Sequence, residues 1–309
     1  MKRVAVLYGG ISAEREVSLS SGRQVIAALR SAGFEVTPIE VGPDLHTTLA
    51  ALMPKPDVVF NALHGRFGED GAIQGVLDWL DIPYTHSGVR ASALAMDKAA
   101  AKAIFISAGL PVAPGGLYEV ASLVDADPLK LPYVIKPLNE GSSVGVEIIR
   151  EGDNRRAAVA CTWRFGRTAI VEEFIPGREL TVGVMDDRAL AVTEIIASQA
   201  FYDYESKYAD GGSSHVVPAQ IHPLATAEAL RIALAAHRAL GCAGASRSDF
   251  RYDDTKCVPG GEPGRLVLLE VNTQPGLTPT SLLPEQAAFL GIDFPQLCRW
   301  MVEHAACRA

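Results

Sequence analysis

A carboxylate and an amide lie two residues apart in the segment Leu268–Gly276, which reads LLEVNTQPG. Side chains two positions apart on a strand point to the same face, so Glu270 and Asn272 would present their oxygens side by side. Such hard oxygen ligands suit Mg²⁺, and Asp249, in the strand-like segment SRSDFRY, could complete the site. From spacing alone, a pair of solvated residues on an edge strand remains the alternative, although the following N-T-Q-P-G turn disfavours it.

A second group of residues could hold phosphate. Lys136 ends a short apolar run, and the loop Gly141–Gly145, GSSVG, could turn several backbone N–H groups toward an anion. The lysine precedes the glycines, so the pattern is neither a P-loop nor G-x-G-x-x-G, and a plain hairpin turn is the alternative. Lys98, in AMDKAAAK, could be a second phosphate ligand, although a single helical lysine is more often a solvated charge.

Two glutamates flank the Pro176-Gly177 turn. Glu172, in IVEEF, follows an apolar run at a position where a domain hinge could receive an adenosine, and its carboxylate could accept a hydrogen bond from a ribose hydroxyl. Glu179 lies just beyond the turn and could serve the same ligand. Spacing alone favours solvated surface carboxylates at both positions.

Two glycine-rich loops near the N-terminus, Gly9–Ser18 and His64–Gly71, each follow a predicted strand. Open α/β sheets bind ligands beyond the carboxyl ends of their strands, so the two loops together favour a small-molecule site. Glu14 and His64 are the polar candidates there. Taken singly, His64 is more often structural, and Glu14 could be a plain carboxylate at a helix start.

The elements that must position these residues divide the chain into three parts. The first alternates strands with helices, which indicates a parallel sheet with crossover helices. An alanine-rich helix over Ser92–Ala108 and three short strands predict a small α+β middle domain, and a hairpin about Asp186–Arg188 opens the last part. A further strand and two helices, the last of them over 294–306 with Asp293 as its cap, complete that part. We therefore expect domains at 1–91, 92–176 and 177–309.

The bulk composition restricts the partners. The 309 residues carry a net charge of −8, which argues against a nucleic acid or an anionic membrane as partner. The five cysteines are odd in number and form no C-x-x-C pair, which predicts reduced thiols in a cytoplasmic protein. The N-terminal residues are typical of a strand rather than of a signal peptide, and no apolar run is long enough for a membrane span.

Taken together, these residues resemble the D-alanine–D-alanine ligase family of the ATP-grasp superfamily. The resemblance covers the whole chain, and its most specific segments are HGRFGEDGAIQG at 64–75 and EVNTQPGLTPTSL at 270–282. The other matching segments are GGISAEREVSLSSG, MDKAAAK, VIKPLNEGSSVG, VEEFIPGRELTVGV, FYDYESKY and SRSDF. The resemblance implies an α/β three-domain ATP-grasp architecture, with an N-terminal parallel-sheet α/β domain, a small α+β middle domain and a C-terminal α+β domain.

The resemblance also implies an activity. Such enzymes use ATP to join two D-alanine molecules through a D-alanyl phosphate, releasing ADP and phosphate, for peptidoglycan precursor synthesis. They are cytoplasmic, and a homodimer is the expected assembly. Lys98 and Lys136 would contact the ATP phosphates, and Glu172 and Glu179 would hold the ribose and nearby nucleotide groups. Two Mg²⁺ ions, with Mn²⁺ as an alternative, would bind the metal ligands Asp249, Glu270 and Asn272.

The remaining implied roles concern the amino acids. Glu14 would hold the amino group of the first D-alanine, with His64 close by, and Ser142 and Tyr208 would join Glu14 in a hydrogen-bonded group that closes loops over the site. The second D-alanine would place its carboxylate on Lys207, Ser281 and Leu282. Arg247 and the backbone N–H of Gly276 would stabilise the oxyanion. An acyl phosphate hydrolyses if water enters, and the polar segment FYDYESKYADGGSS suits a mobile lid.

The chain departs from the family pattern in two ways. Arg251 and Ser248 stand where the family usually has apolar strand residues, and the connection 253–264, DDTKCVPGGEPG, is longer than expected. Added loop length costs little free energy, so the longer hairpin need not disturb the metal site. It nevertheless leaves the pairing of Asp249 less secure than that of Glu270 with Asn272.

Three other functions remain open at this stage. An ATP-grasp ligase could join a different acid and amine, although the adjacent Lys207 and Tyr208 favour D-alanine as second substrate. A nucleotide-dependent dehydrogenase is suggested by Gly9-Gly10, but the chain lacks G-x-G-x-x-G. A catalytically inactive nucleotide-binding module is disfavoured because every expected polar position is filled.

Overall fold

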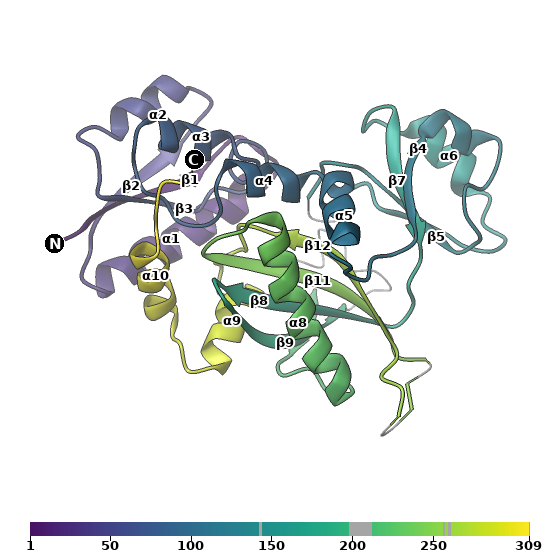
Figure 1. Ribbon diagram of the computed structural model, residues 1–309. Coiled ribbons are helices and arrows are strands. Elements are labelled where there is room, and N and C mark those ends of the chain that lie inside the picture. The colour runs from purple at the N-terminus through teal and green to yellow at the C-terminus, as the bar shows by residue number, and fades with distance from the viewer. Residues whose placement is uncertain (142–143, 198–211, 256, 259–260, 309) are drawn as a thin grey trace.

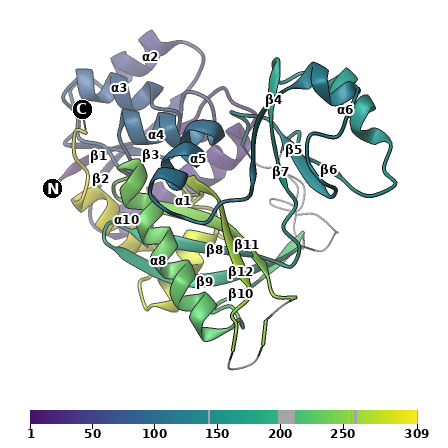
Figure 2. The same cartoon turned by 45° about the vertical axis from the view of Figure 1, so that its right-hand side comes forward.

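In the part of the chain that the structure describes, three separate sheets follow one another (Figure 1). The computed structural model describes residues 1–141, 144–197, 212–255, 257–258 and 261–308. In Figures 1 and 2 the C-terminal sheet lies below and between the other two. Helix α10 (Phe294–Glu303), near the end of the chain, packs against α1 (Arg15–Ser31) of the first part.

The first sheet is parallel, with strand order β2-β1-β3, as the alternating pattern predicted. Because β1 and β3 are neighbours and run the same way, the loops that leave their carboxyl ends lie side by side. Glu14 and His64 are therefore brought to one edge of this sheet. The elements of this part, besides α1, are β1 (Arg3–Gly9), β2 (Glu35–Val41), α2 (Leu45–Ala51), β3 (Val58–Asn61) and α3 (Ala72–Trp79).

The single helix predicted over Ser92–Ala108 is wrong, because the structure has two helices there. Helix α4 covers Val89–Met96 and helix α5 covers Lys98–Ser107. Asp97 has an extended backbone and caps α5, since its carboxylate accepts hydrogen bonds from the N–H groups of the second and third following residues, both at 3.0 Å. The break puts Lys98 at the first turn of α5. There its backbone N–H donates to the carbonyl of Leu138, in the segment that precedes the loop Gly141–Gly145.

The central sheet is antiparallel, with strand order β4-β7-β5-β6. Val134 pairs with Glu172 across β5 and β7, so Lys136, two residues further along β5, is a diagonal neighbour of Glu172 on the same face. The sequence predicted three of these strands but neither β4 nor α6. The elements are β4 (Gly115–Glu119), the 3₁₀ helix η1 (Val120–Val124), β5 (Tyr133–Lys136), β6 (Glu147–Ile149), α6 (Arg155–Thr162) and β7 (Thr168–Glu173).

The C-terminal sheet has strand order β10-β9-β8-β11-β12, and all its neighbouring strands are antiparallel. One face carries apolar side chains that pack against α8 and α5. The opposite face of its three adjacent strands β8, β11 and β12 carries charged and polar side chains. The elements are β8 (Arg178–Met185), β9 (Arg188–Ala197), β10 (Ser213–Val216), α8 (Pro223–Leu240), β11 (Ala245–Asp253), β12 (Arg265–Asn272) and α9 (Leu282–Phe289), with α10 following.

Helix α10 ends at Glu303, three residues before the predicted end, and its cap is the predicted one. The carboxylate of Asp293 accepts from the N–H of Gln296, while the Gln296 side chain accepts from the N–H of Asp293. Among the described residues, no helix combines the length and the apolar character that crossing a membrane requires.

Candidate active site

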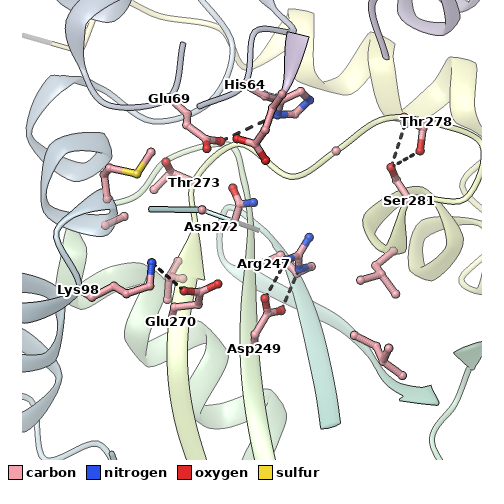
Figure 3. A pocket seen from close by; sticks show the side chains of 18 of the residues that line it. His64, Glu69, Lys98, Arg247, Asp249, Glu270, Asn272, Thr273, Thr278 and Ser281 are labelled. Carbon is pink, nitrogen blue, oxygen red and sulfur yellow. Dashed lines mark hydrogen bonds and ion pairs between the residues drawn. The ribbon is translucent and has the colours of Figure 1, made fainter. Parts of the chain in front are cut away.

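Charged side chains from β11 and β12 stand in register on the polar face of the C-terminal sheet. Asp249 lies directly opposite Glu270, and Arg247 lies opposite Asn272. Figure 3 shows the four side chains turned toward the same cavity. The two-residue spacing therefore does put Glu270 and Asn272 on one face. Despite the long connection 253–264, Asp249 remains paired with Glu270, and the register shifts once, between Asp249 and Phe250.

Each of the two carboxylates is bound by a cation. Arg247 donates two hydrogen bonds to Asp249, from Nε at 2.9 Å and from Nη2 at 2.7 Å, and Thr181 Oγ1 donates a third at 2.6 Å. Lys98 Nζ reaches Glu270 Oε2 at 3.3 Å (Figure 3). The two-strand geometry thus concentrates negative charge, which the flanking cations compensate.

The donor set fits a divalent cation that is shared with a phosphorylated ligand. Two carboxylates and an amide are oxygen ligands of the kind that Mg²⁺ takes, and Mg²⁺ usually binds through one or two carboxylates plus substrate phosphates. In the part of the chain that the structure describes, no group of three His, Cys, Asp or Glu side chains forms a complete metal cage by itself. A Mg²⁺ ion held by these side chains would complete its ligand set with oxygens of a substrate or of water.

Glu172 is buried between two lysines of the central part. It is 7 % exposed, and its carboxylate contacts Lys102 Nζ at 2.6 Å and Lys136 Nζ at 2.5 Å. The alternative of a solvated carboxylate is therefore wrong for Glu172. No sequence pattern singles out Lys102, which also donates to the carbonyl of Ala113 at 2.6 Å. Burial alone would raise the pKa of Glu172, but the ammonium groups of Lys136 and Lys102 outweigh burial and lower it.

Replacing Glu172 by Gln should lower thermal stability because two partly buried ammonium groups lose their counter-charge. We expect a loss of about 3 kcal/mol near neutral pH, measurable by thermal and urea unfolding. Since the pKa of Glu172 is lowered in the folded protein, its stabilising effect is complete above the usual carboxyl pKa. That effect is lost as the pH falls through the lowered pKa. The gap between wild type and Glu172→Gln should therefore shrink in acid, and a gap independent of pH would contradict this account.

The loop between β3 and α3 brings two further polar side chains to the cleft. His64 is buried, with Nε2 3.4 Å from Ser21 Oγ and Nδ1 3.9 Å from Glu69 Oε2 (Figure 3). Glu69 was not predicted, although it lies within the segment HGRFGEDGAIQG. The carboxylate of Glu14 lies against Gly65, where a side chain would come within 2.9 Å of Glu14 Oε2. Only glycine fits there, which explains why the loop can approach the carboxylate.

Gln274 joins this loop to the turn that follows β12. Its side chain is buried, accepts a hydrogen bond from Asn61 Nδ2 at 2.9 Å and donates to the carbonyl of Leu63. Its backbone N–H donates to Asn272 Oδ1 at 2.8 Å. One residue therefore connects the His64 loop with a predicted metal ligand.

Gln274→Leu, which keeps the approximate volume but removes both side-chain hydrogen bonds, should raise the KM for the substrate that binds beside His64 and lower the melting temperature. The carbonyl of Leu63 would be left buried without its partner, at a cost of about 2 kcal/mol. The control is His237→Leu, which removes a buried 2.7 Å hydrogen bond to Ser246 on the opposite face of the sheet. We expect this control to lose stability without a change in KM, and equal KM values in both variants would refute the positioning role of Gln274.

The turn after β12 leads into α9 at Ser281. Gly276 lies close to Ser281, because a side chain at Gly276 would come within 2.9 Å of Ser281 Oγ. Ser281 Oγ accepts from the N–H of Thr278 at 2.9 Å, and Leu282 is buried at the first position of α9. The backbone of Gly276 therefore lies next to Ser281, at the start of α9.

One cleft joins most of the predicted residues. Among the residues that line it are Glu14, His64, Lys98, Glu179, Arg247, Asp249, Glu270, Asn272, Gly276, Ser281 and Leu282. Lys136 and Glu172 are not among its lining residues and lie together on one face of the central sheet. Ser142, Lys207 and Tyr208, and with them most of the predicted lid, lie outside the described residues.

The comparisons with known proteins agree along the whole chain. Residues 118–303 match the family model for the D-ala D-ala ligase C-terminus, and residues 3–51 and 43–87 match the model for the N-terminus. The D-alanine–D-alanine ligase of Granulibacter bethesdensis is 72% identical over 309 residues, covering 100% of this chain and 99% of the relative. That of Acidiphilium cryptum is 68% identical over 308 residues, with 100% of both chains covered.

Solved structures share the fold as well. The crystal structure of a D-alanine–D-alanine ligase from Bacillus anthracis superposes with a TM-score of 0.83 at 30% identity, covering 98% of this chain and 97% of that one. A structure of the Bacillus anthracis ligase complexed with ATP gives a TM-score of 0.79 at 29% identity, covering 98% and 96%.

A parallel N-terminal sheet followed by two antiparallel sheets around a charged cleft defines an enzyme of the ATP-grasp class, as the sequence predicted. Within that class, the chain belongs to the D-alanine–D-alanine ligase family. This membership excludes the dehydrogenase considered from the sequence.

Proposed function

We propose that the cleft binds ATP and two D-alanine molecules and joins them to D-alanyl-D-alanine for peptidoglycan precursor synthesis. The observation that carries this proposal is one cleft in which residues of the first part, helix α5 and the C-terminal sheet converge. Membership of the ligase family supports the same reaction.

The reaction has two steps. A carboxylate oxygen of the first D-alanine attacks the γ-phosphorus of ATP, ADP leaves, and a D-alanyl phosphate forms. The amine of the second D-alanine then attacks the acyl carbon and loses a proton. The C–O bond to phosphate breaks, and the dipeptide and phosphate are released. ATP is required because a free carboxylate is a poor acyl donor.

On the nucleotide side, the proposed ligands are cationic and acidic groups of helix α5 and of two sheets. Lys98 and Lys136 would contact the phosphates, and Glu179, which lines the cleft, would hold the ribose. Glu172 keeps its place in the nucleotide site, but both its oxygens are already engaged by lysines. Its proposed role is therefore to fix the Lys136 ammonium group for the nucleotide.

We assign Asp249, Glu270 and Asn272 to two Mg²⁺ ions, with Mn²⁺ as an alternative. When bound, the ions supply positive charge to the phosphoryl oxygens. Arg247, which lines the cleft, donates to Asp249 in the described structure and would orient this carboxylate. Arg247 and the N–H of Gly276 would bind the oxyanion that forms as the second amine attacks.

The amino-acid side of the proposal uses the first part and the start of α9. Glu14 would hold the amino group of the first D-alanine, with His64 beside it. Ser281 and Leu282 would receive the carboxylate of the second D-alanine together with Lys207. Ser142 and Tyr208, for which only the resemblance supplies roles, would join Glu14 when the loops close.

Other proposals concern the protein as a whole. We propose domains at 1–91, 92–176 and 177–309 because each of these ranges holds one sheet. Helices α4 and α5 nevertheless pack against the C-terminal sheet. A cytoplasmic homodimer without a nucleic-acid or membrane partner is the assembly that the family resemblance and the net charge of −8 favour.

The test is phosphate release from ATP and Mg²⁺ in the presence of D-alanine, L-alanine or no amino acid. The proposal expects release that depends on D-alanine, together with a product of the mass of D-alanyl-D-alanine. Release that occurs equally with other amino acids, or without that product, would refute D-alanine as substrate and direct the search to other acid and amine pairs.

A further inference from the structure

Arg251, which departs from the apolar residue expected in the family, contacts the linker between the central and C-terminal sheets. The linker, residues 174–177, joins β7 to β8. Arg251 Nε donates to the carbonyl of Ile175 at 3.1 Å, and Nη2 donates to the carbonyl of Gly177 at 2.7 Å. The guanidinium therefore fixes two of the four linker residues from the side of β11.

The same guanidinium faces Glu179. Arg251 and Glu179 are opposite each other in the register of β11 and β8, and Nη1 lies 3.7 Å from Glu179 Oε2. Both side chains are 22% exposed, so this ion pair is only partly screened by water. Glu179 lines the cleft, whereas Arg251 is not among the residues that line it.

An arginine at this position has a cost that an apolar residue would avoid. Burial lowers the pKa of Arg251, although the nearby Glu179 opposes this effect. The guanidinium is stabilised there by two carbonyls, one carboxylate and the ring of Phe174, whose centre lies 6.0 Å away. All these partners lie at the junction between the central and C-terminal sheets. The proposed function places the nucleotide at this junction.

We propose that Arg251 is a positioning residue for the nucleotide, acting through Glu179 and the linker rather than by contact with the substrate. Fixing the linker sets the separation between the Lys136 side of the nucleotide site and the Glu179 side. Pairing with Glu179 sets the direction of a carboxylate that would accept from the ribose. This inference rests on the proposed function, because it assigns Arg251 to the same nucleotide site.

The test compares Arg251→Met and Arg251→Lys with Arg265→Met. Arg265 pairs with Glu173, next to the linker, but both side chains are more than 40% exposed, at 45% and 42%. ATP binding is measured by calorimetry, and kcat and the KM values for ATP and D-alanine by phosphate release. We expect Arg251→Met to weaken ATP binding and raise the KM for ATP about tenfold, with kcat and the KM for D-alanine little changed.

The lysine variant keeps the charge but cannot serve two carbonyls and Glu179 together, so its KM for ATP should be intermediate. It also carries the test if Arg251→Met does not fold. Arg265→Met should match the wild type. An unchanged KM for ATP in both Arg251 variants would overturn the inference. It would also be overturned if ATP affinity, kcat and both KM values worsened together, in proportion to a fall in melting temperature.

A double-mutant cycle separates positioning from a general structural effect. If Arg251 acts through Glu179, Arg251→Met should weaken ATP binding less in the Glu179→Gln variant than it does in the wild-type protein. Strictly additive effects would remove Glu179 from the inference. If the wild-type protein does not bind ATP, the proposed function and the inference are both refuted. If the wild type turns over normally and the Arg251 variants bind ATP as tightly as it does, only the inference is refuted.

Discussion

Glu270→Gln should lower kcat by about a thousandfold while leaving the fold intact, because removal of one of the charges proposed to bind Mg²⁺ forfeits several kcal/mol of charge stabilisation. Glu270 lies opposite Asp249 on the polar face of the sheet, and its carboxylate pairs with Lys98. Glutamine keeps the size and one oxygen but not the charge. Raising the Mg²⁺ concentration should restore part of the activity, since the defect lies in metal affinity.

The matched control for this variant is Glu173→Gln. Glu173 is an exposed glutamate that pairs with Arg265 at 2.9 Å, away from the cleft. Its replacement should leave kcat and the Mg²⁺ dependence unchanged. Near-wild-type turnover by Glu270→Gln at low Mg²⁺ would contradict the assignment of this residue to the metal.

Arg247→Lys should lower kcat by about a hundredfold or more, because the lysine cannot reproduce two functions of the guanidinium. In the structure Arg247 holds Asp249 with two parallel hydrogen bonds. In the proposed reaction it also faces the developing oxyanion. A single ammonium group can meet one of these demands, so kcat should fall more than the affinity for ATP.

The control for charge and geometry is Arg178→Lys. Arg178 also holds a carboxylate through two nitrogens, that of Glu194 on β9, but it is not among the residues that line the cleft. We expect Arg178→Lys to lower the stability of the protein without a comparable loss of kcat. If Arg247→Lys retained full turnover, the oxyanion role of Arg247 would be refuted.

Much of the fold could be predicted from local patterns. Strand and helix alternation predicted the parallel order of the first sheet, and the two-residue period predicted the shared face of Glu270 and Asn272. Both predictions rest on the regular geometry of strands and helices, which the residue pattern of a short segment is enough to indicate. The break at Asp97 was missed because an alanine-rich run favours helix on both sides, whereas the decisive feature is one capping carboxylate.

The parts of the site that escaped prediction depend on contacts between distant segments. Glu172 and Lys102 are 70 residues apart, and no local pattern indicates that they meet or that Glu172 is buried. Gln274 and Asn61 are separated by 213 residues, and only the packing of the first part on the turn after β12 joins them. Arg251 was noticed as a departure from the family, but its partners in the linker became visible only in three dimensions.

The measurement that tests the central claim most directly uses D-alanine labelled with ¹⁸O in its carboxylate, with ATP and Mg²⁺, and mass spectrometry of both products. Since a carboxylate oxygen forms the bond to phosphorus and leaves with it, the account predicts that each released phosphate carries one ¹⁸O atom. D-Alanyl-D-alanine should appear in equal amount. Unlabelled phosphate, or labelled phosphate without the dipeptide, would contradict ligation through a D-alanyl phosphate.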